Sequence, residues 1–296
     1  MASLKEIKGR IASVQSTQKI TSAMKMVASA KFHRAQAAIG GMAPYEQKLS
    51  AILSAFLSEG GEDDLASPLS AVHPAVNKVA IVAFSSNSSL CGAFNSNVAR
   101  DLHAIIQSFP DLTKEQIIVY PIGKKIAQAA QKERCTVAGT YDKLAEQANY
   151  DAISELADSL MKAYAGGEID KVILLYHHFK SSSSQVLQQK ELLPVSVSGI
   201  VASQTADKVS TTSPDYIVEP SRAALFSTLL PQVICLNLFT ALLDSQASEH
   251  AARMTAMQIA TDNAADLLDE LTLNYNKSRQ QAITSELLDI VGGSMQ

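Results

Sequence analysis

Two segments at opposite ends of the chain carry apolar residues at alternating spacings of three and four, the pattern of a coiled-coil seam. Near the amino terminus the pattern comprises Leu4, Ile7, Ile11 and Val14, and it continues less regularly through Ala23, Met24, Val27 and Ala30. Near the carboxyl terminus it comprises Met257, Ala260, Ala264, Leu267 and Leu271, followed by Ile283, Leu287 and Ile290. Each segment predicts a long helix with one apolar stripe. Two such stripes are most simply buried against each other, so we expect an antiparallel coiled coil.

The predicted helices occupy residues 1–58 and 219–292. Within the first, Gly40, Gly41 and Pro44 predict a break or kink. Some 60 helical residues would extend on the order of 90 Å, whereas a compact domain built from the middle of the chain would be only about 30 Å across. The terminal helices are therefore expected to protrude from the rest of the protein.

Residues 76–200 have a different pattern, typical of an α/β domain. Three β-branched apolar runs predict buried strands, at 78–84, 116–122 and 171–179. Helix-like stretches occur at 98–108, 124–132 and 152–164, and the serine-rich stretch after 180 predicts a loop leading into an edge strand. Alternating strands and helices indicate βαβ units, so we expect a central Rossmann-like domain with a mostly parallel sheet.

Charge is distributed unevenly along the chain. The net charge is −4 and the pI about 5.9, which excludes nucleic-acid binding by overall electrostatics. Residues 1–40 nevertheless hold seven lysines and arginines against one glutamate, and residues 244–296 hold eight acidic residues against three basic ones. The two ends are either solvated helix faces or surfaces that attract each other or a partner.

Cysteine usage and hydropathy bound the cellular environment. The three cysteines include no CxxC pair, which favours buried, reduced thiols in the cytoplasm. The amino terminus lacks the apolar run of a signal peptide, and the longest apolar stretch, Val233–Leu243, is shorter than the roughly 20 residues that span a bilayer. We expect a protein that is soluble or peripheral to a membrane.

A search for chemical motifs predicts no catalytic, cofactor or metal site. Gly123-Lys124 lies at a predicted strand-to-helix junction, but Ile118 and Lys125 occupy positions where a phosphate-binding loop needs Gly and Ser or Thr. His177 and His178 are adjacent on a predicted strand and must point to opposite faces, so they cannot share a metal.

Two alternatives remain open at this level. The central domain could bind a nucleotide and make the chain an enzyme with helical arms. The basic N-terminal helix could instead lie on an anionic membrane, although its stripe is rich in Ala, Met and Gln where such helices carry Trp, Phe and Leu.

The two ends together resemble a known family. The stretch "LKEIKGRIASVQSTQKITSAMKMVASAKFHRAQ" (4–36) closely resembles the N-terminal helix of the gamma subunit of bacterial-type F-type ATP synthases. The stretch at 245–293, with "EHAARM" and "RQQAITSE", resembles the C-terminal helix of that family. The resemblance also covers "SSLCGAFN" (88–95) and "DYIVEPS" (215–221), although Asn87-Ser88-Ser89 stands where the family often has Asp-Arg-Gly.

The resemblance implies a non-catalytic rotor at the cytoplasmic face of the bacterial inner membrane. Proton flow through the c-subunit ring would turn this chain inside a head of three alpha and three beta subunits, with the epsilon subunit near its α/β domain. The positions that match head contacts are Lys19, Met24, Lys25, Arg253, Gln280, Thr284 and Glu286. Those that match contacts with epsilon and the c ring are Asp215, Tyr216 and Glu219.

Overall fold

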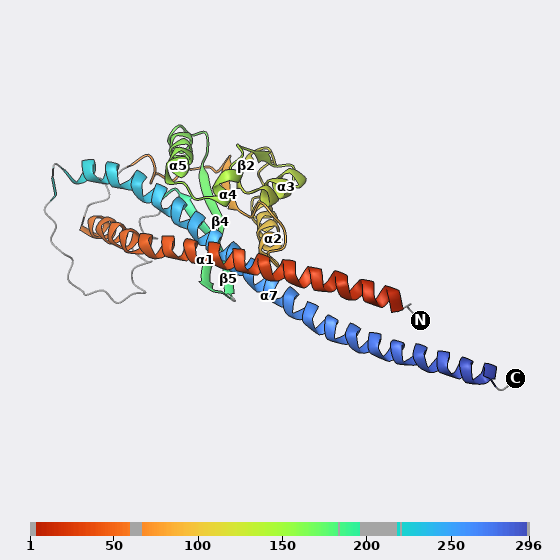
Figure 1. Ribbon diagram of the computed structural model, residues 1–296. Coiled ribbons are helices and arrows are strands. Elements are labelled where there is room, and N and C mark those ends of the chain that lie inside the picture. Colours follow the sequence, from red (N-terminus) through yellow and green to blue (C-terminus); the bar gives the residue numbers. More distant parts are fainter. Residues whose placement is uncertain (1–3, 60–66, 183, 196–217, 220, 295–296) are drawn as a thin grey trace. The chain divides into compact units, whose positions relative to one another are not determined.

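The computed structural model describes residues 4–59, 67–182, 184–195, 218–219 and 221–294. The chain divides into two compact units, of which the first comprises 1–30 with 253–296 and the second comprises 31–252. Helices α1 (Leu4–Glu59) and α7 (Arg222–Ser294) run through both units (Figure 1). The predicted break in the first helix is wrong. Helix α1 continues through Gly40, Gly41 and Pro44, because one missing backbone hydrogen bond does not outweigh the packing of adjacent turns.

The first unit is an antiparallel helix pair. Thr21 Oγ1 of α1 lies 2.8 Å from Thr261 Oγ1 of α7. Leu4, 17 residues before Thr21, lines a groove with Ser278, 17 residues after Thr261. The two contacts share one register, so the predicted antiparallel pairing is confirmed.

The seam of the pair follows a different set of residues from the predicted one. After Val14 the buried or half-buried positions keep the spacing of four and three, at Gln18, Thr21, Lys25 and Ala28. Ala23, Val27 and Ala30 are exposed. In α7 the seam runs through Met257, Thr261, Ala264, Leu268 and Leu271, whereas Leu267 is 43% exposed. The prediction counted only apolar side chains, and polar residues at seam positions shifted its register.

The threonine pair of the seam is expected to specify register at some cost in stability. Thr261 Oγ1 lies 2.7 Å from the carbonyl oxygen of Met257, and Thr21 Oγ1 lies 3.0 Å from that of Gln18, so each hydroxyl has a carbonyl acceptor on its own helix as well as the facing hydroxyl. Valine has the same shape as threonine, so replacing both threonines by valine removes one buried and one half-buried hydroxyl and should raise the free energy of unfolding by about 1 kcal/mol. Thermal unfolding of the full chain, followed by circular dichroism, measures this effect.

Thr17→Val is the matched control, because the Thr17 hydroxyl bonds the carbonyl oxygen of Ser13 on an exposed face. We expect it to change stability little. A double variant of Thr21 and Thr261 that is less stable than the native chain would contradict this assignment of the seam.

The second unit contains a five-stranded sheet in the order β3-β2-β1-β4-β5. Its strands are β1 (Val79–Phe84), β2 (Ile117–Ile122), β3 (Thr136–Val137), β4 (Lys171–Ser181) and β5 (Ser184–Leu193). Only the β4–β5 pairing is antiparallel, which confirms the mostly parallel sheet with an added edge strand. The short elements β3 and α4 (Asp142–Glu146) were not predicted.

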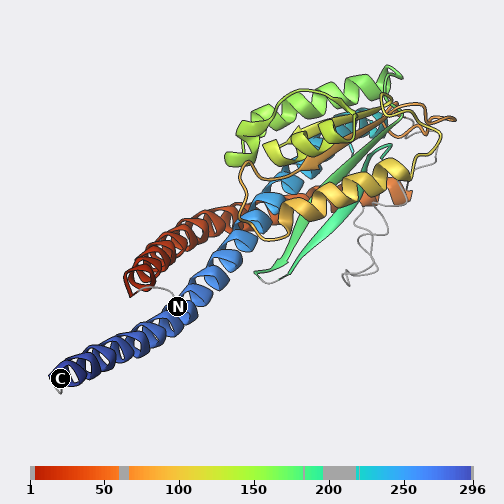
Figure 2. The ribbon, with the colours of Figure 1, turned by 90° about the vertical axis from the view of Figure 1, so that its right-hand side faces the viewer.

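Helices cover both faces of the sheet (Figure 2). Helices α2 (Phe94–Gln107) and α3 (Lys124–Lys132) pack on the face that carries Val79, Ile81 and Ala83. Helix α5 (Tyr150–Ala165) and the adjoining parts of α1 and α7 pack on the face that carries Ala80, Val82 and Phe84. Because β1 is buried on both faces, it reads as a continuous apolar run.

Within the described part of the chain, one helical segment, Ala224–Val291, is long and apolar enough to cross a membrane by length and composition. Half of its most apolar window is buried inside the protein. Leu230, Ile234, Leu238 and Leu242 belong to the core under the sheet. A core helix of this kind passes the same test, so the segment is weak evidence for membrane crossing.

Candidate partner interface

The candidate residues on α1 lie on or beside the seam of the first unit. Lys19 is exposed, while Met24 and Lys25 are half-buried. Large apolar side chains next to them also face solvent, with Ile20 60%, Met26 66% and Val27 58% exposed. This part of α1 therefore presents a mixed basic and apolar surface.

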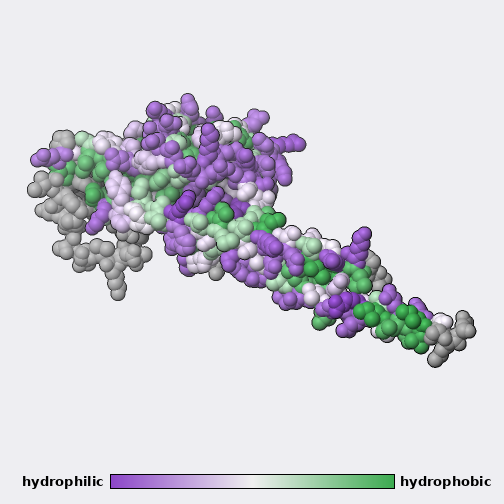
Figure 3. Space-filling model, in the orientation of Figure 1, coloured by the Kyte–Doolittle hydropathy of each residue, from purple (hydrophilic) through white to green (hydrophobic). Residues whose placement is uncertain are grey.

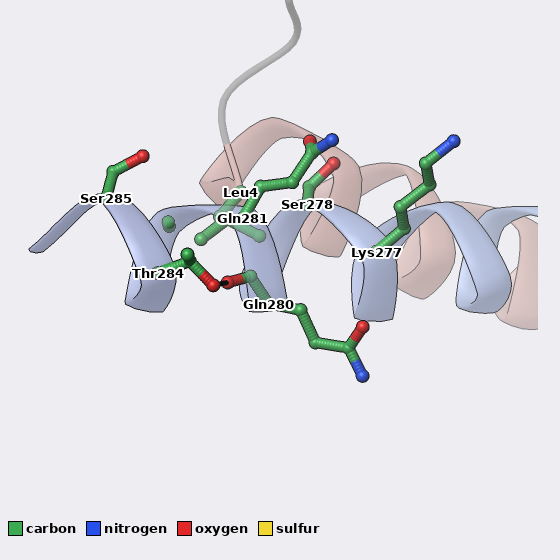
Figure 4. Close-up of a pocket in the computed structure, with 8 residues that line it drawn as sticks. Leu4, Lys277, Ser278, Gln280, Gln281, Thr284 and Ser285 are labelled. Carbon is green, nitrogen blue, oxygen red and sulfur yellow. Dashed lines mark hydrogen bonds between the residues drawn. The ribbon is translucent and has the colours of Figure 1, made fainter. Parts of the chain in front are cut away.

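Two candidate residues on α7 line a groove at the end of the helix pair (Figure 4). The groove has a volume of about 830 Å³ and is lined by Leu4 of α1 and by residues between Lys277 and Ser285 of α7. Gln280 and Thr284 are among them, and Thr284 Oγ1 donates to the Gln280 carbonyl oxygen at 2.9 Å. Glu286 is exposed beyond the groove.

The remaining candidate residues lie apart from the groove or outside the described residues. Arg253 is half-buried at the beginning of the α7 segment of the first unit and has an interaction partner. Glu219 is exposed just before α7. Asp215 and Tyr216 lie outside the described residues. The structure thus brings together Gln280 and Thr284, and separately Met24 and Lys25.

The last turns of α7 form an exposed apolar surface that the sequence prediction assigned to the seam. Beyond Ala282 the exposed apolar side chains are Ile283, Leu287, Leu288, Ile290 and Val291. They gather near the carboxyl-terminal end of the helix (Figure 3). The assignment to the seam was wrong because Leu4, the first described residue of α1, lies level with Ser278. Counting residues outward from the Thr21–Thr261 contact would have shown that α7 continues beyond the first turn of α1.

The opposite charges of the two ends do not pair at these positions. Among the described residues, Lys19, Lys25, Asp266 and Asp269 have no oppositely charged side chain within ion-pair distance, and the ion pair Arg10–Glu6 lies within α1. Lys19, Asp266 and Asp269 are exposed and Lys25 is half-buried, so these charges are available to a partner.

The crevice where a Rossmann-like sheet binds ligands is closed by the protein itself. Strand order reverses between β1 and β4, and the carboxyl ends of these strands flank the usual ligand position. There the ring of Phe94 stacks on His177, with centroids 4.3 Å apart. His177 is 1% exposed, so these two stacked rings occupy the position where a ligand would lie.

The start of α3, a possible anion site in the sequence, is also occupied. The backbone N–H of Lys124 donates to Asn87 Oδ1 at 3.0 Å, and that of Ile126 donates to Ser85 Oγ at 2.9 Å. The N–H of Lys125 donates to the carbonyl oxygen of Ser86 at 3.2 Å. Because these donors are satisfied internally, they do not form a phosphate cradle. Among the described residues, no group of three His, Cys, Asp or Glu could hold a metal ion.

The buried imidazole of His177 predicts acid lability. Burial lowers the pKa of His177 from 6.5 to about 4, against the opposing charge of Asp101. The unfolded chain therefore binds the extra proton first, and stability present above pH 6.5 is lost as the pH falls toward 4. We expect the free energy of unfolding to fall by about 3 kcal/mol over this range. Chemical unfolding of the full chain at a series of pH values measures this decrease.

His177→Leu should remove this part of the pH dependence, while His103→Gln, at an exposed histidine, should leave it intact. An unchanged slope between pH 4 and 6.5 in His177→Leu would show that another group causes the acid lability.

The chain is similar over its full length to subunits of one enzyme complex. A protein-family model described as ATP synthase matches residues 3–295, which places the chain among the subunits of that enzyme complex. The ATP synthase gamma chains of Phocaeicola vulgatus and Bacteroides fragilis are 52% and 54% identical to it, each over 295 residues and 100% of both chains. That of Flavobacterium johnsoniae is 41% identical over 99% of this chain and 98% of its own. The chain belongs to the ATP synthase gamma chain family.

Solved structures support the fold. A rotor chain of the Euglena gracilis mitochondrial ATP synthase aligns with a TM-score of 0.64 at 19% identity, covering 95% of this chain and 98% of its own. A chain from the central stalk and c ring of the Tetrahymena thermophila enzyme aligns with a TM-score of 0.56 at 23% identity, covering 81% of this chain and 99% of its own.

Proposed function

We propose that this chain is the central-stalk rotor subunit of an ATP synthase, which couples proton flow through a c ring to ATP synthesis or hydrolysis in an alpha/beta head. The observation that carries the proposal is a helix pair with unpaired charges and exposed apolar side chains, in a chain that matches gamma chains over its full length. Its partners are the alpha, beta and epsilon subunits and the c ring. Through them the chain is held at the cytoplasmic face of the inner membrane.

The surface of the first unit suits a shaft that meets several partners in turn. Exposed lysines such as Lys19 attract acidic loops over a distance of about 8 Å at physiological salt, without requiring one geometry. A deeply buried ion pair would instead hold the shaft at one position, since breaking such a pair costs about 3 to 5 kcal/mol. The exposed apolar side chains at the end of α7 suit the same role, because hydrophobic contacts with a partner are also non-directional.

The chain itself supplies no active site in this proposal. The Phe94–His177 stack in the switch-point crevice and the satisfied α3 amino terminus favour this view over a nucleotide-binding enzyme. Catalysis then belongs to other subunits of the complex.

Co-purification tests the proposal. The tagged full-length chain is isolated from its native cells and the product is assayed for ATPase activity. We expect alpha and beta chains in excess over this chain, with ATPase activity in the complex and none in the chain alone. Isolation of the chain by itself, together with saturable nucleotide binding, would overturn the proposal and restore the enzyme alternative.

Cross-linking tests the assignment of the candidate residues. With a photoreactive reagent attached to cysteine, we expect Thr284→Cys to link to alpha or beta chains. Glu219→Cys should link to epsilon or c chains. Asp111→Cys, in the loop after α2, serves as the comparison. Identical products from all three positions would contradict the assignment.

A further inference from the structure

Helix α7 carries a run of polar residues in a place where a helix core is normally apolar. Asp244, Gln246 and Ser248, here called the polar belt, are 6%, 9% and 0% exposed. Burying polar groups costs stability unless each finds a partner. The partners of the belt therefore indicate what it is for.

Every member of the belt bonds the α/β part of the second unit. Asp244 Oδ2 lies 2.7 Å from His178 Nδ1 of β4. Ser248 Oγ donates to the His177 carbonyl oxygen at 3.2 Å. On the other side of the helix, Gln246 Nε2 donates to the carbonyl oxygens of Leu144 and Ala145 in α4, at 2.8 and 3.4 Å. The belt thus joins α7 to two separate elements.

The β4–β5 hairpin is built to reach this belt. Strand β1 pairs with β4 only as far as Leu175, and beyond that point β4 pairs with β5 alone. Phe179 then packs against Phe32 of α1, with ring centroids 5.1 Å apart, beside Ala247 and Ala251. The distal half of the hairpin is consequently held by both long helices.

Contacts with the hairpin follow one face of α7. Lys190 Nζ of β5 donates to Asn237 Oδ1 at 2.8 Å, seven residues before Asp244. Ser248 and Ala251 follow at spacings of four and three. The face from Asn237 to Ala251 is about 21 Å long. A slip of α7 by one turn would break all of these bonds together.

The ionisable groups of this joint are mutually compensating. Burial raises the pKa of the Asp244 carboxyl, and the His178 hydrogen bond and the charge of Lys190 oppose that effect. Lys190 is exposed as a residue, but desolvation of its amine lowers its pKa, and the charges of Glu46 of α1 and Asp244 oppose that effect. Glu46 in turn accepts a bond of 3.5 Å from Thr240 Oγ1 of α7. Such a cluster specifies one register at a cost in stability.

We propose that the polar belt and the β4–β5 hairpin form the joint that carries torque between the α/β domain and the long helices. Asp244 and His178 are its positioning residues. Apolar surfaces alone resist sliding poorly, since a shifted register buries similar area. Directional bonds at Asp244, Gln246 and Ser248 make the shifted register unfavourable. The inference rests on the proposed rotor function.

The test compares coupling in assembled complexes. His178→Leu with Asp244→Leu removes both partners of the hydrogen bond, so the buried carboxyl of Asp244 is not left without its partner. We expect normal assembly and ATPase activity, with a several-fold decrease in protons pumped per ATP hydrolysed in membrane vesicles. The control is His103→Leu with Glu133→Leu, a histidine–carboxylate pair of 3.1 Å within the α/β domain, which should leave the ratio unchanged.

A second double variant tests whether the bond between the two side chains, and not their packing alone, sets the pumping ratio. Exchanging the pair, as His178→Asp with Asp244→His, restores the histidine–carboxyl hydrogen bond in reverse and should recover much of the pumping ratio. An unchanged ratio in the double leucine variant would overturn the joint. Absence of ATP-driven pumping by complexes that contain the native chain would instead refute the rotor function, so the two failures are distinguishable.

Discussion

Met24→Lys is expected to uncouple ATP hydrolysis from proton pumping while leaving the fold intact. Met24 is half-buried on α1, next to Lys25 and five residues after Lys19. Lysine at this position replaces an adaptable apolar contact with a third cation beside the acidic loops that the proposed function places there. A stronger contact at one rotor angle has to be broken in every step. An added barrier of about 1.4 kcal/mol slows each step about tenfold, so that ATP hydrolysed without a completed step moves no protons and the pumping ratio falls.

The measurement is the acidification of inverted membrane vesicles per ATP hydrolysed. Met26→Lys is the matched control, because Met26 is 66% exposed on the same helix and the substitution adds the same charge two residues away. We expect a much smaller decrease of the ratio in the control. Equal losses in the two variants, or a lowered melting temperature of Met24→Lys without a coupling defect, would contradict the role assigned to Met24.

The strands and helices of the α/β domain were predictable because their periodicity reflects burial. Helix α3 was predicted with its observed bounds, and β1 was predicted to within one residue. Both are short elements covered by neighbours, so sequence pattern and environment agree. The two-residue strand β3 and the five-residue helix α4 are too short to show a period.

The seam was predicted in kind but not in register. Val27 and Leu267 were assigned to it on hydrophobicity, yet Thr21 and Thr261 occupy it. Hydropathy counts cannot see that a hydroxyl is acceptable when it bonds a neighbouring carbonyl oxygen or the facing helix. The polar belt was missed for a related reason, since its partners His178 and Leu144 are distant in sequence.

The candidate interface depended on resemblance more than on pattern. Without it, Thr284 and Glu286 would be taken as a solvated helix end, which matches their exposure in the structure. What the structure adds is the apolar surface around Leu287 and Leu288 and the groove that Gln280 lines. Neither is visible in sequence, because both depend on where α1 begins relative to α7.

Gly123→Ala is expected to destabilise the second unit by about 4 kcal/mol, as a sum of backbone strain and steric overlap. Gly123 has a φ of 110° and lies between the end of β2 and the start of α3. A methyl group there would collide with the backbone carbonyl oxygen of Ser85, in the segment that follows β1. That segment cannot move aside without disturbing the hydrogen bonds that Ser85 and Asn87 accept from the backbone of α3. Chemical unfolding of the full chain measures the loss.

Gly167→Ala separates the two contributions. Gly167 has a φ of 70°, and a methyl group on it would meet no atom within 4 Å, so this variant carries backbone strain alone. We expect it to lose about 1 kcal/mol. If Gly123→Ala were no less stable than Gly167→Ala, the turn before α3 would have room to open, and the start of α3 would have to be considered again as an anion site.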